Sequence, residues 1–152
     1  MPLLDLPALA AALPRGARLI GIDPGRKRIG LALSDAGLRL AGPSATLGRA
    51  KLTRNAAEIA AIARREEAGG LVVGLPLEMD GTFGPSAQAA RDWALALSEA
   101  TGLPAAMQDE RMTTAESEAA MLAADVSRAR RAEMRDRLAA ARILQAALDR
   151  LG

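Results

Sequence analysis

The residues best able to do chemistry in this chain are four carboxylates at separate points of the sequence: Asp23, Asp109, Glu110 and Asp136. Asp23 and the Asp-Glu pair follow short apolar runs typical of buried strands, and sites in α/β sheets are usually built at strand ends. Carboxylates that meet at one sheet edge repel one another, and a divalent cation relieves that repulsion. Two-metal sites activate a water and stabilise the leaving oxygen in phosphodiester cleavage. We therefore expect a metal-dependent hydrolase in which Asp23, Glu110 and Asp136 bind the cation.

Asp23 lies where a strand is expected to give way to a tight turn. It follows the apolar residues 18–22 and precedes Pro24-Gly25, a turn signal because Pro presets φ and Gly accepts positive φ. Residues 29–33 then return as the partner strand. Three cations occupy the turn beside the carboxylate: Arg26, Lys27 and Arg28. The alternative is a solvated hairpin tip with an incidental Asp.

The second candidate is the segment that begins with Asp109 and Glu110. Successive side chains of a strand alternate between its faces, so only one of the two faces the site if the strand persists that far. We favour Glu110 as the metal ligand and keep Asp109 as an alternative, since Arg111 could pair with either. Thr113 and Thr114 are expected at a helix N-terminus, where hydroxyls also suit phosphate. The alternative is a surface salt bridge before a helix.

Asp136 is the third candidate, because it lies on the apolar side of an expected helix. Its neighbours at helical spacing include Ala139, Ala140 and Ile143, so it points along the face that packs on the sheet. A charge there is costly unless it is paired or bound to a metal. A salt bridge to one of the nearby arginines is the alternative.

The residue types that are absent exclude several classes of enzyme. The chain has no His, no Cys and no Tyr. This excludes Ser-His-Asp and Cys-His mechanisms and any zinc site built on His or Cys. The ligands of any metal must be oxygens, which favours Mg²⁺ or Mn²⁺.

Positive charge is concentrated in two segments although the net charge is only +2. Residues 15–28 hold five cations and one acid, and residues 126–142 hold six Arg and two acids, so each segment carries a local +4. Such segregation suits a polyanion such as nucleic acid. Phe83 and Trp93 are the two aromatic residues, so we do not expect a base-stacking platform.

The order of expected elements indicates an α/β fold with a mixed five-stranded sheet, three antiparallel strands followed by parallel ones, and helices on both faces. At 152 residues we expect one domain, with residues 1–15 as an N-terminal extension. No apolar run approaches the roughly 20 residues of a membrane span, so we expect a cytoplasmic protein.

Strands are expected at residues 18–22, 29–33, 38–47, 71–74 and 103–107, with an edge or bulge at Pro43. Helices are expected within 1–13 and at 53–68, 86–101, 113–124 and 132–151. Thr53 or Asn55 is expected to cap the second helix and Ser86 the third, whose stripe Ala90, Trp93, Ala94 and Leu97 is expected in the core.

Four motifs in this order resemble the YqgF family, known as Holliday junction resolvase-like proteins and as pre-16S ribosomal RNA nucleases. They cover almost the whole chain beyond residue 15. The motifs are Gly21 to Asp35, Val73 to Pro76 with Asp80-Gly81-Thr82, Asp109 to Thr114, and Asp136 with Ala139-Ala140 and Ile143-Leu144-Gln145.

The resemblance implies a ribonuclease H-like fold and a divalent-metal-dependent nuclease that matures the 5′ end of small-subunit ribosomal RNA in the cytoplasm. It implies that the acidic site comprises Asp23, Asp109 or Glu110, and Asp136. Nucleic acid is the expected partner, with pre-ribosomal RNA favoured and branched DNA as the alternative, and the protein is expected to be a monomer or weak homodimer. Substrate contacts are assigned to Lys27, Arg28, Arg111, Thr113 and Thr114.

Two other functions are compatible with the sequence. A non-catalytic nucleic-acid-binding factor in ribosome assembly or transcription needs only the Arg-rich segments. A nucleotide phosphotransferase is the other, because the Asp23-Pro24-Gly25 turn resembles the phosphate loop of actin-like ATPases. Those enzymes enclose their nucleotide between two such domains, and one copy argues against this assignment.

Overall fold

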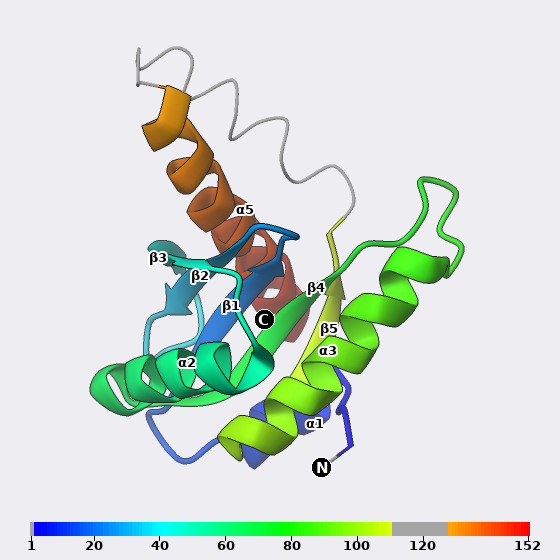
Figure 1. Cartoon of the computed structure of the whole chain (residues 1–152). Helices are drawn as coiled ribbons and strands as arrows, with labels where there is room; N and C mark the ends of the chain where they lie inside the picture. The colour runs from blue at the N-terminus through cyan, green and yellow to red at the C-terminus, as the bar shows by residue number, and fades with distance from the viewer. Residues whose placement is uncertain (1, 111–127) are drawn as a thin grey trace.

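A mixed five-stranded sheet with helices on both faces forms the centre of the computed structural model, which describes residues 2–110 and 128–152 (Figure 1). This confirms the predicted α/β class. The elements are α1 (Leu6–Ala12), β1 (Arg18–Pro24), β2 (Arg28–Ser34), β3 (Ala41–Gly48), α2 (Leu52–Glu66), β4 (Ala68–Leu75), α3 (Pro85–Thr101), β5 (Ala105–Asp109) and α5 (Arg128–Leu151).

The strands lie in the order β3-β2-β1-β4-β5. Short turns join β1, β2 and β3, which are therefore antiparallel, whereas helical crossovers make β4 and β5 parallel to β1. The expected irregularity at Pro43 is confirmed, because β3 is an edge strand and its register with β2 shifts there. The carboxyl ends of β1, β4 and β5 meet at one edge of the sheet.

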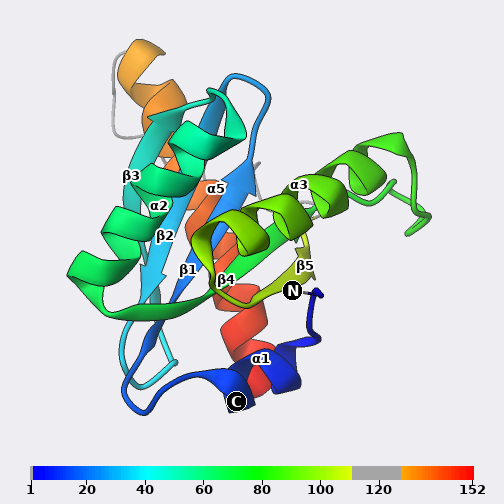
Figure 2. The same cartoon turned by 60° about the horizontal axis from the view of Figure 1, so that its bottom comes forward.

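The two faces of the sheet are covered by different helices (Figure 2). On one face, α2 and α3 bury a cluster that includes Ile22, Ile59 and Leu97. On the other face, α5 and the short α1 bury a second cluster that includes Leu19 and Leu144. Leu19 and Ile22 belong to the same strand, so β1 contributes apolar side chains to both layers, as expected of a central strand.

Two glycines let α5 approach the sheet closely. A Cβ at Gly21 would lie 2.6 Å from the Cβ of Leu144, and a Cβ at Gly30 would overlap the backbone of Asp136. Gly30 is the antiparallel partner of Asp23 in the register of β1 with β2. The close approach of α5 therefore places Asp136 beside the end of β1, where Asp23 lies.

The beginning of α2 differs from the prediction. Its N-cap is Lys51, and neither Thr53 nor Asn55 holds that position. The buried side chain of Asn55 instead accepts a hydrogen bond from the amide of Ala50 and donates one to the carbonyl of Gly48. Asn55 therefore fixes the connection from β3 to α2. Residue preferences alone do not distinguish this role of an Asn near a helix start from the role of an N-cap.

The later helices also begin at other residues than predicted. The N-cap of α3 is Gly84, with Pro85 in the first turn, so Ser86 is not the cap. The last helix, α5, begins at Arg128 rather than at the predicted residue 132. The helix predicted at 113–124 lies outside the described residues.

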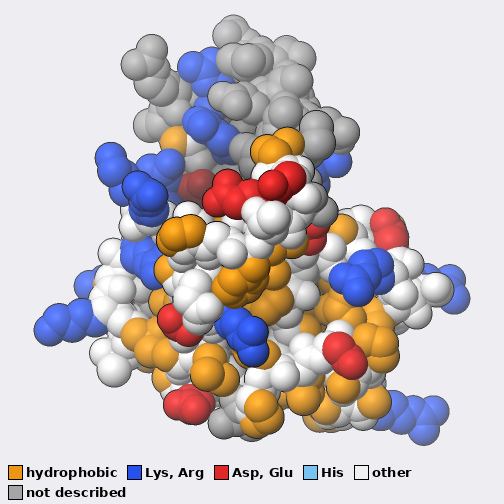
Figure 3. Space-filling view, turned by 90° about the vertical axis from the view of Figure 1, so that its right-hand side faces the viewer, with side chains coloured by type: hydrophobic (Ala, Val, Ile, Leu, Met, Phe, Trp, Pro, Cys, Tyr) orange, Lys and Arg blue, Asp and Glu red, His pale blue; other side chains and the backbone are white. Residues whose placement is uncertain are grey.

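Charged and apolar side chains are unevenly distributed on one face of the molecule (Figure 3). On the face seen from the right-hand side of Figure 1, an acidic group lies close to basic side chains in the upper part, and the lower part carries isolated charges among apolar side chains (Figure 3). Among the residues that the structure describes, no helix is both long enough and apolar enough to cross a bilayer.

Candidate active site

Asp23 lies at the end of β1, next to a tight turn. The amide of Gly25 donates to the carbonyl of Asp23 at 3.0 Å. Gly25 does not adopt the predicted positive φ, and its role is steric, because a Cβ there would overlap the carbonyl oxygen of Arg28. Burial first, and the charge of Asp136 second, raise the pKa of Asp23 to about 6. The carboxylate is therefore in an environment that disfavours its charge.

Glu110 follows β5 directly and extends the pairing of β5 with β4. Its amide donates to the carbonyl of Leu75 at 3.2 Å. The carboxylate occupies the space above Gly74, where a Cβ would overlap Oε2. Burial, followed by the charges of Asp23 and Asp109, raises the pKa of Glu110 to about 7. Asp23 and Glu110 therefore oppose each other's ionisation.

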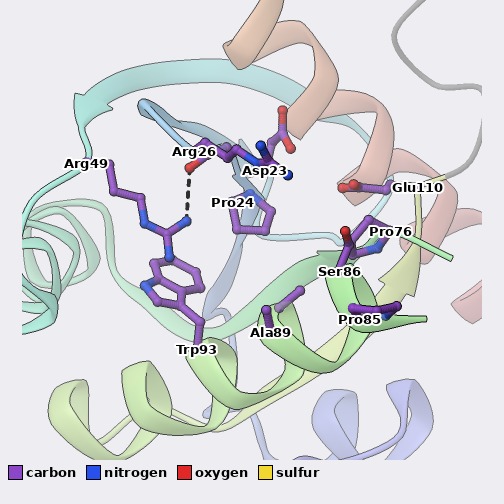
Figure 4. Close-up of a pocket in the computed structure, with 12 residues that line it drawn as sticks. Asp23, Pro24, Arg26, Arg49, Pro76, Pro85, Ser86, Ala89, Trp93 and Glu110 are labelled. Carbon is purple, nitrogen blue, oxygen red and sulfur yellow. Dashed lines mark hydrogen bonds between the residues drawn. The ribbon is translucent and has the colours of Figure 1, made fainter. Parts of the chain in front are cut away.

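Both carboxylates line one cavity of about 630 Å³ at the carboxyl edge of the sheet (Figure 4). Glu110 lines this cavity and Asp109 does not, and the choice of Glu110 as the metal ligand stays a prediction. The remaining lining comes from the β1–β2 turn, the residue after β3, the start of the β4–α3 loop and the first turns of α3: Pro24, Gly25, Arg26, Arg49, Pro76, Pro85, Ser86, Ala89, Ala90 and Trp93.

Asp136 does not line the cavity, although its charge acts on Asp23. The Nε of Arg28 donates to its Oδ2 at 2.6 Å. Asp136 is therefore in a salt bridge, as the alternative expected, but its partner is on β2 and is not one of the arginines near it in the sequence. Within residues 2–110 and 128–152, no three acidic side chains are grouped as a metal site. The three-carboxylate site therefore stays a prediction, and the pair that shares the cavity is Asp23 and Glu110.

The chemistry of this pair fits a hard divalent cation. Asp23 and Glu110 offer carboxylate oxygens, the donors that Mg²⁺ and Mn²⁺ prefer. Burial and nearby negative charges raise both pKa values, so the surroundings disfavour the charged forms. A cation between them would remove their mutual repulsion and replace lost hydration.

The residues predicted to bind substrate have different positions. Lys27 is exposed on the β1–β2 turn, and its carbonyl accepts from the amide of Arg49 at 2.9 Å. Arg28 is held by Asp136. The other three predicted contacts, at Arg111, Thr113 and Thr114, lie outside the described residues.

Sequence reasoning missed two residues of the cavity wall, Arg49 and Trp93. The stripe containing Trp93 was expected in the core, and Ala94 and Leu97 are indeed buried, but Trp93 also lines the cavity. Arg49 follows β3 and carried no motif. The one available signal was that Trp93 is the only tryptophan of the chain.

Comparison with known proteins identifies relatives over nearly the full length. The family described as "RuvX: Holliday junction resolvase" matches residues 17–150. A protein of Acidiphilium cryptum named "Putative pre-16S rRNA nuclease" is 56% identical, over 99% of this chain and 96% of its own. A protein of Gluconacetobacter diazotrophicus with the same name is also 56% identical, over 98% of this chain and 97% of its own.

Among solved structures, RuvC of T. thermophilus in complex with a Holliday junction substrate is similar in fold. Its TM-score is 0.53 at 18% sequence identity, and the match covers 90% of this chain and 96% of that one. This similarity confirms the predicted ribonuclease H-like architecture of the resolvases.

Proposed function

This chain belongs to the RuvX family, and we propose that it is a nuclease that uses a divalent cation, Mg²⁺ or Mn²⁺, to hydrolyse phosphodiester bonds of structured nucleic acid. The substrate we propose is pre-16S ribosomal RNA, because relatives that are 56% identical over nearly the whole chain carry the name "Putative pre-16S rRNA nuclease". We propose that cleavage takes place at its 5′ end. We place this activity in the cytoplasm, in a protein that acts as a monomer or weak homodimer.

The observation that carries this proposal is a pair of carboxylates in one cavity whose surroundings disfavour their charged forms. Asp23 and Glu110 come from different strands, share the cavity and have pKa values raised to about 6 and about 7. A fold that needed only stability would gain by replacing them with neutral residues. Carboxylates with raised pKa values in one cavity are typical of a functional site, and a bound cation would stabilise their charged forms.

Asp23 and Glu110 would hold the cation, joined by Asp136 if its carboxylate turns from Arg28. Such a cation supplies an activated water nucleophile and stabilises the oxygen of the leaving group. The chain itself contributes position: β1 and β5 end at one sheet edge, and Gly74 leaves space for the carboxylate of Glu110. Partial burial strengthens the interaction of these carboxylates with any positive charge.

Opposite charges line the same cavity. Arg26 and Arg49 lie on its wall together with the two acids. Arginine binds phosphate oxygens through a planar fork of N–H donors. A phosphodiester could therefore be held between the arginines and the carboxylates, with its scissile bond on the acidic side.

The test is cleavage of an RNA that carries the 5′ precursor extension of small-subunit ribosomal RNA, in Mg²⁺ or Mn²⁺, with a four-way DNA junction as the second substrate. Glu110→Gln should lose activity in both metals while its circular dichroism and thermal melting show a folded protein. Asp149→Asn, an exposed acid near the far end of α5, is the matched control and should cleave like the parent. Equal cleavage by Glu110→Gln and the parent would overturn the proposed function.

One observation favours a second candidate, a nucleic-acid-binding factor without catalysis. Asp136 is bound to Arg28, and the described residues contain no preformed group of three acids. This candidate predicts binding of the same RNA without turnover in any divalent metal. Turnover by the parent that depends on Glu110 would exclude it.

A further inference from the structure

Arg49 is fixed in place on the cavity wall opposite the acids. Its guanidinium carbon lies 5.1 Å from the centroid of the Trp93 ring, and its Nη1 donates to the carbonyl of Gly25 at 2.9 Å (Figure 4). Its backbone amide donates to the carbonyl of Lys27 at 2.9 Å. These contacts tie the residue after β3 to the β1–β2 turn that carries Asp23.

The positive charge of Arg49 is not neutralised by a carboxylate of the described residues. Among the described residues Arg49 forms no salt bridge with a carboxylate, in contrast to Arg28, whose guanidinium binds Asp136. An exposed arginine usually samples many rotamers, and ordering it in advance lowers the entropy lost on binding. A held and uncompensated guanidinium at a cavity is suited to binding an anion.

We propose that Arg49, held by Trp93 and Gly25, binds a backbone phosphate of the nucleic-acid strand whose scissile bond lies at Asp23 and Glu110. This inference rests on the proposed nuclease function and specifies how that site holds its substrate. The cavity of about 630 Å³ is within the usual range of ligand sites, so it can admit one nucleotide unit of a strand between the two walls.

The contact is assigned to phosphate rather than to a base because of how Trp93 is covered. Its ring packs against the apolar cluster beneath α2 and α3, and Arg49 lies over the ring. The indole therefore serves as a support for the guanidinium through a cation–π contact. A phosphate contact of this kind would bind strands of any sequence and would weaken with salt.

The test measures binding of an RNA hairpin with a single-stranded 5′ tail to protein carrying Asp23→Asn in Mg²⁺, over a range of salt concentrations. Arg49→Gln should weaken binding about tenfold and lower the slope of log affinity against log salt by about 0.7 to 0.9. Arg64→Gln removes the same charge from an exposed site at the far end of α2 and should change neither quantity.

Two further variants separate the phosphate contact from a structural role. Arg49→Lys keeps the charge and loses the planar fork, so it should keep the salt slope and lose affinity a few-fold. Trp93→Leu should lose part of the binding affinity that Arg49→Gln loses. Trp93→Phe should bind with nearly the affinity of the parent, because a ring again supports the guanidinium. Arg49→Gln that matches the parent in affinity and slope would overturn the inference.

The only tryptophan of the chain reports on the same site. RNA should change the fluorescence of Trp93 when Arg49 is present, and the change should be much smaller in Arg49→Gln. Inorganic phosphate at millimolar concentration should leave the emission unchanged, and an equal change with phosphate alone would overturn the assignment to a strand.

The outcomes also separate this inference from the proposed function. A parent protein that binds the RNA but does not cleave it in Mg²⁺ or Mn²⁺ would overturn the nuclease assignment, while the effect of Arg49→Gln on binding would still test the phosphate contact. Failure of the parent to bind either RNA or DNA would overturn both.

Discussion

Two consecutive turns of the β1–β2–β3 meander each have an aspartate beside them, and the folded chain shifts the pKa values of the two carboxyls in opposite directions. At the β1–β2 turn, burial and the nearby charge of Asp136 raise the pKa of Asp23 to about 6. At the β2–β3 turn, Asp35 is exposed, and the backbone amides of Leu40 and Arg39, which donate to its carboxylate, lower its pKa.

The two carboxylates differ in whether the folded chain favours their charged form. The ionised carboxylate of Asp35 closes its own turn and therefore stabilises the native chain. The ionised carboxylate of Asp23 is disfavoured by its surroundings, as is that of Glu110 in the same cavity. A positively charged ligand at the end of this core strand would stabilise the charged form of Asp23.

The largest effect is expected on catalysis. Asp23→Asn should lower kcat/KM for RNA cleavage by at least about a hundredfold, because it removes a proposed cation ligand. Asp35→Asn should stay within about twofold of the parent, because exposed turn residues away from the site rarely affect chemistry. Similar losses in both variants would show that the two aspartates do not differ in function.

Moving α5 away from the site should have the next largest effect. Gly30→Ala would place a Cβ against the backbone of Asp136, and we expect a loss of about 2 to 3 kcal/mol in the free energy of unfolding. Gly42→Ala on the edge strand meets no atom within 4 Å and should change stability by less than about 0.5 kcal/mol. Urea titration measures both, and equal values would contradict the close approach of α5.

Stability should depend on pH with the sign set by the raised pKa values. Asp23 and Glu110 bind protons more tightly in the folded than in the unfolded state, so their contribution to the free energy of unfolding should fall as pH rises from about 4 to about 7. At pH 8, Asp23→Asn should be more stable than the parent by about 1 to 2 kcal/mol, a value reduced for partial solvation. At pH 3, where both carboxyls are protonated, the two proteins should be equally stable.

That comparison is measured by urea unfolding of both proteins at pH 3 and pH 8 without divalent metal. Added Mg²⁺ at pH 8 should stabilise the parent and not Asp23→Asn, reducing the difference between them. A variant less stable than the parent at pH 8 would mean that the charge of Asp23 is favourable in the metal-free fold.

The smallest effect is expected at the exposed turn, with the opposite sign. The lowered pKa of Asp35 means that its stabilising contribution is present above about pH 4 and is lost as the pH falls through the folded-state value. Asp35→Asn should lower the melting temperature slightly at pH 7, and the difference from the parent should shrink as the pH falls through the folded-state pKa of Asp35. The Asn oxygen can still accept the two amide hydrogen bonds, which keeps the loss small.

The sequence was sufficient for the sheet and for the position of Asp23. Apolar runs bounded by turn residues located the strands, and Pro24-Gly25 marked the strand end that carries the acid. It could not choose between Asp109 and Glu110, because that choice depends on how far β5 pairs with β4. The amide of Glu110 bonded to Leu75 is such a long-range contact.

Contacts between distant segments account for what the sequence did not predict. The salt bridge from Arg28 to Asp136 joins β2 to α5, and local spacing indicated only that some arginine was available. The packing of Arg49 on Trp93 joins the end of β3 to α3, and helical spacing alone assigned Trp93 to the core. Such pairs depend on the tertiary arrangement, which no single motif encodes.

The cation site can be tested most directly by anomalous diffraction from crystals saturated with Mn²⁺. A manganese peak is expected about 2.0 to 2.5 Å from carboxylate oxygens of both Asp23 and Glu110. A saturated crystal with no peak between these two side chains, or with manganese bound only elsewhere, would contradict it.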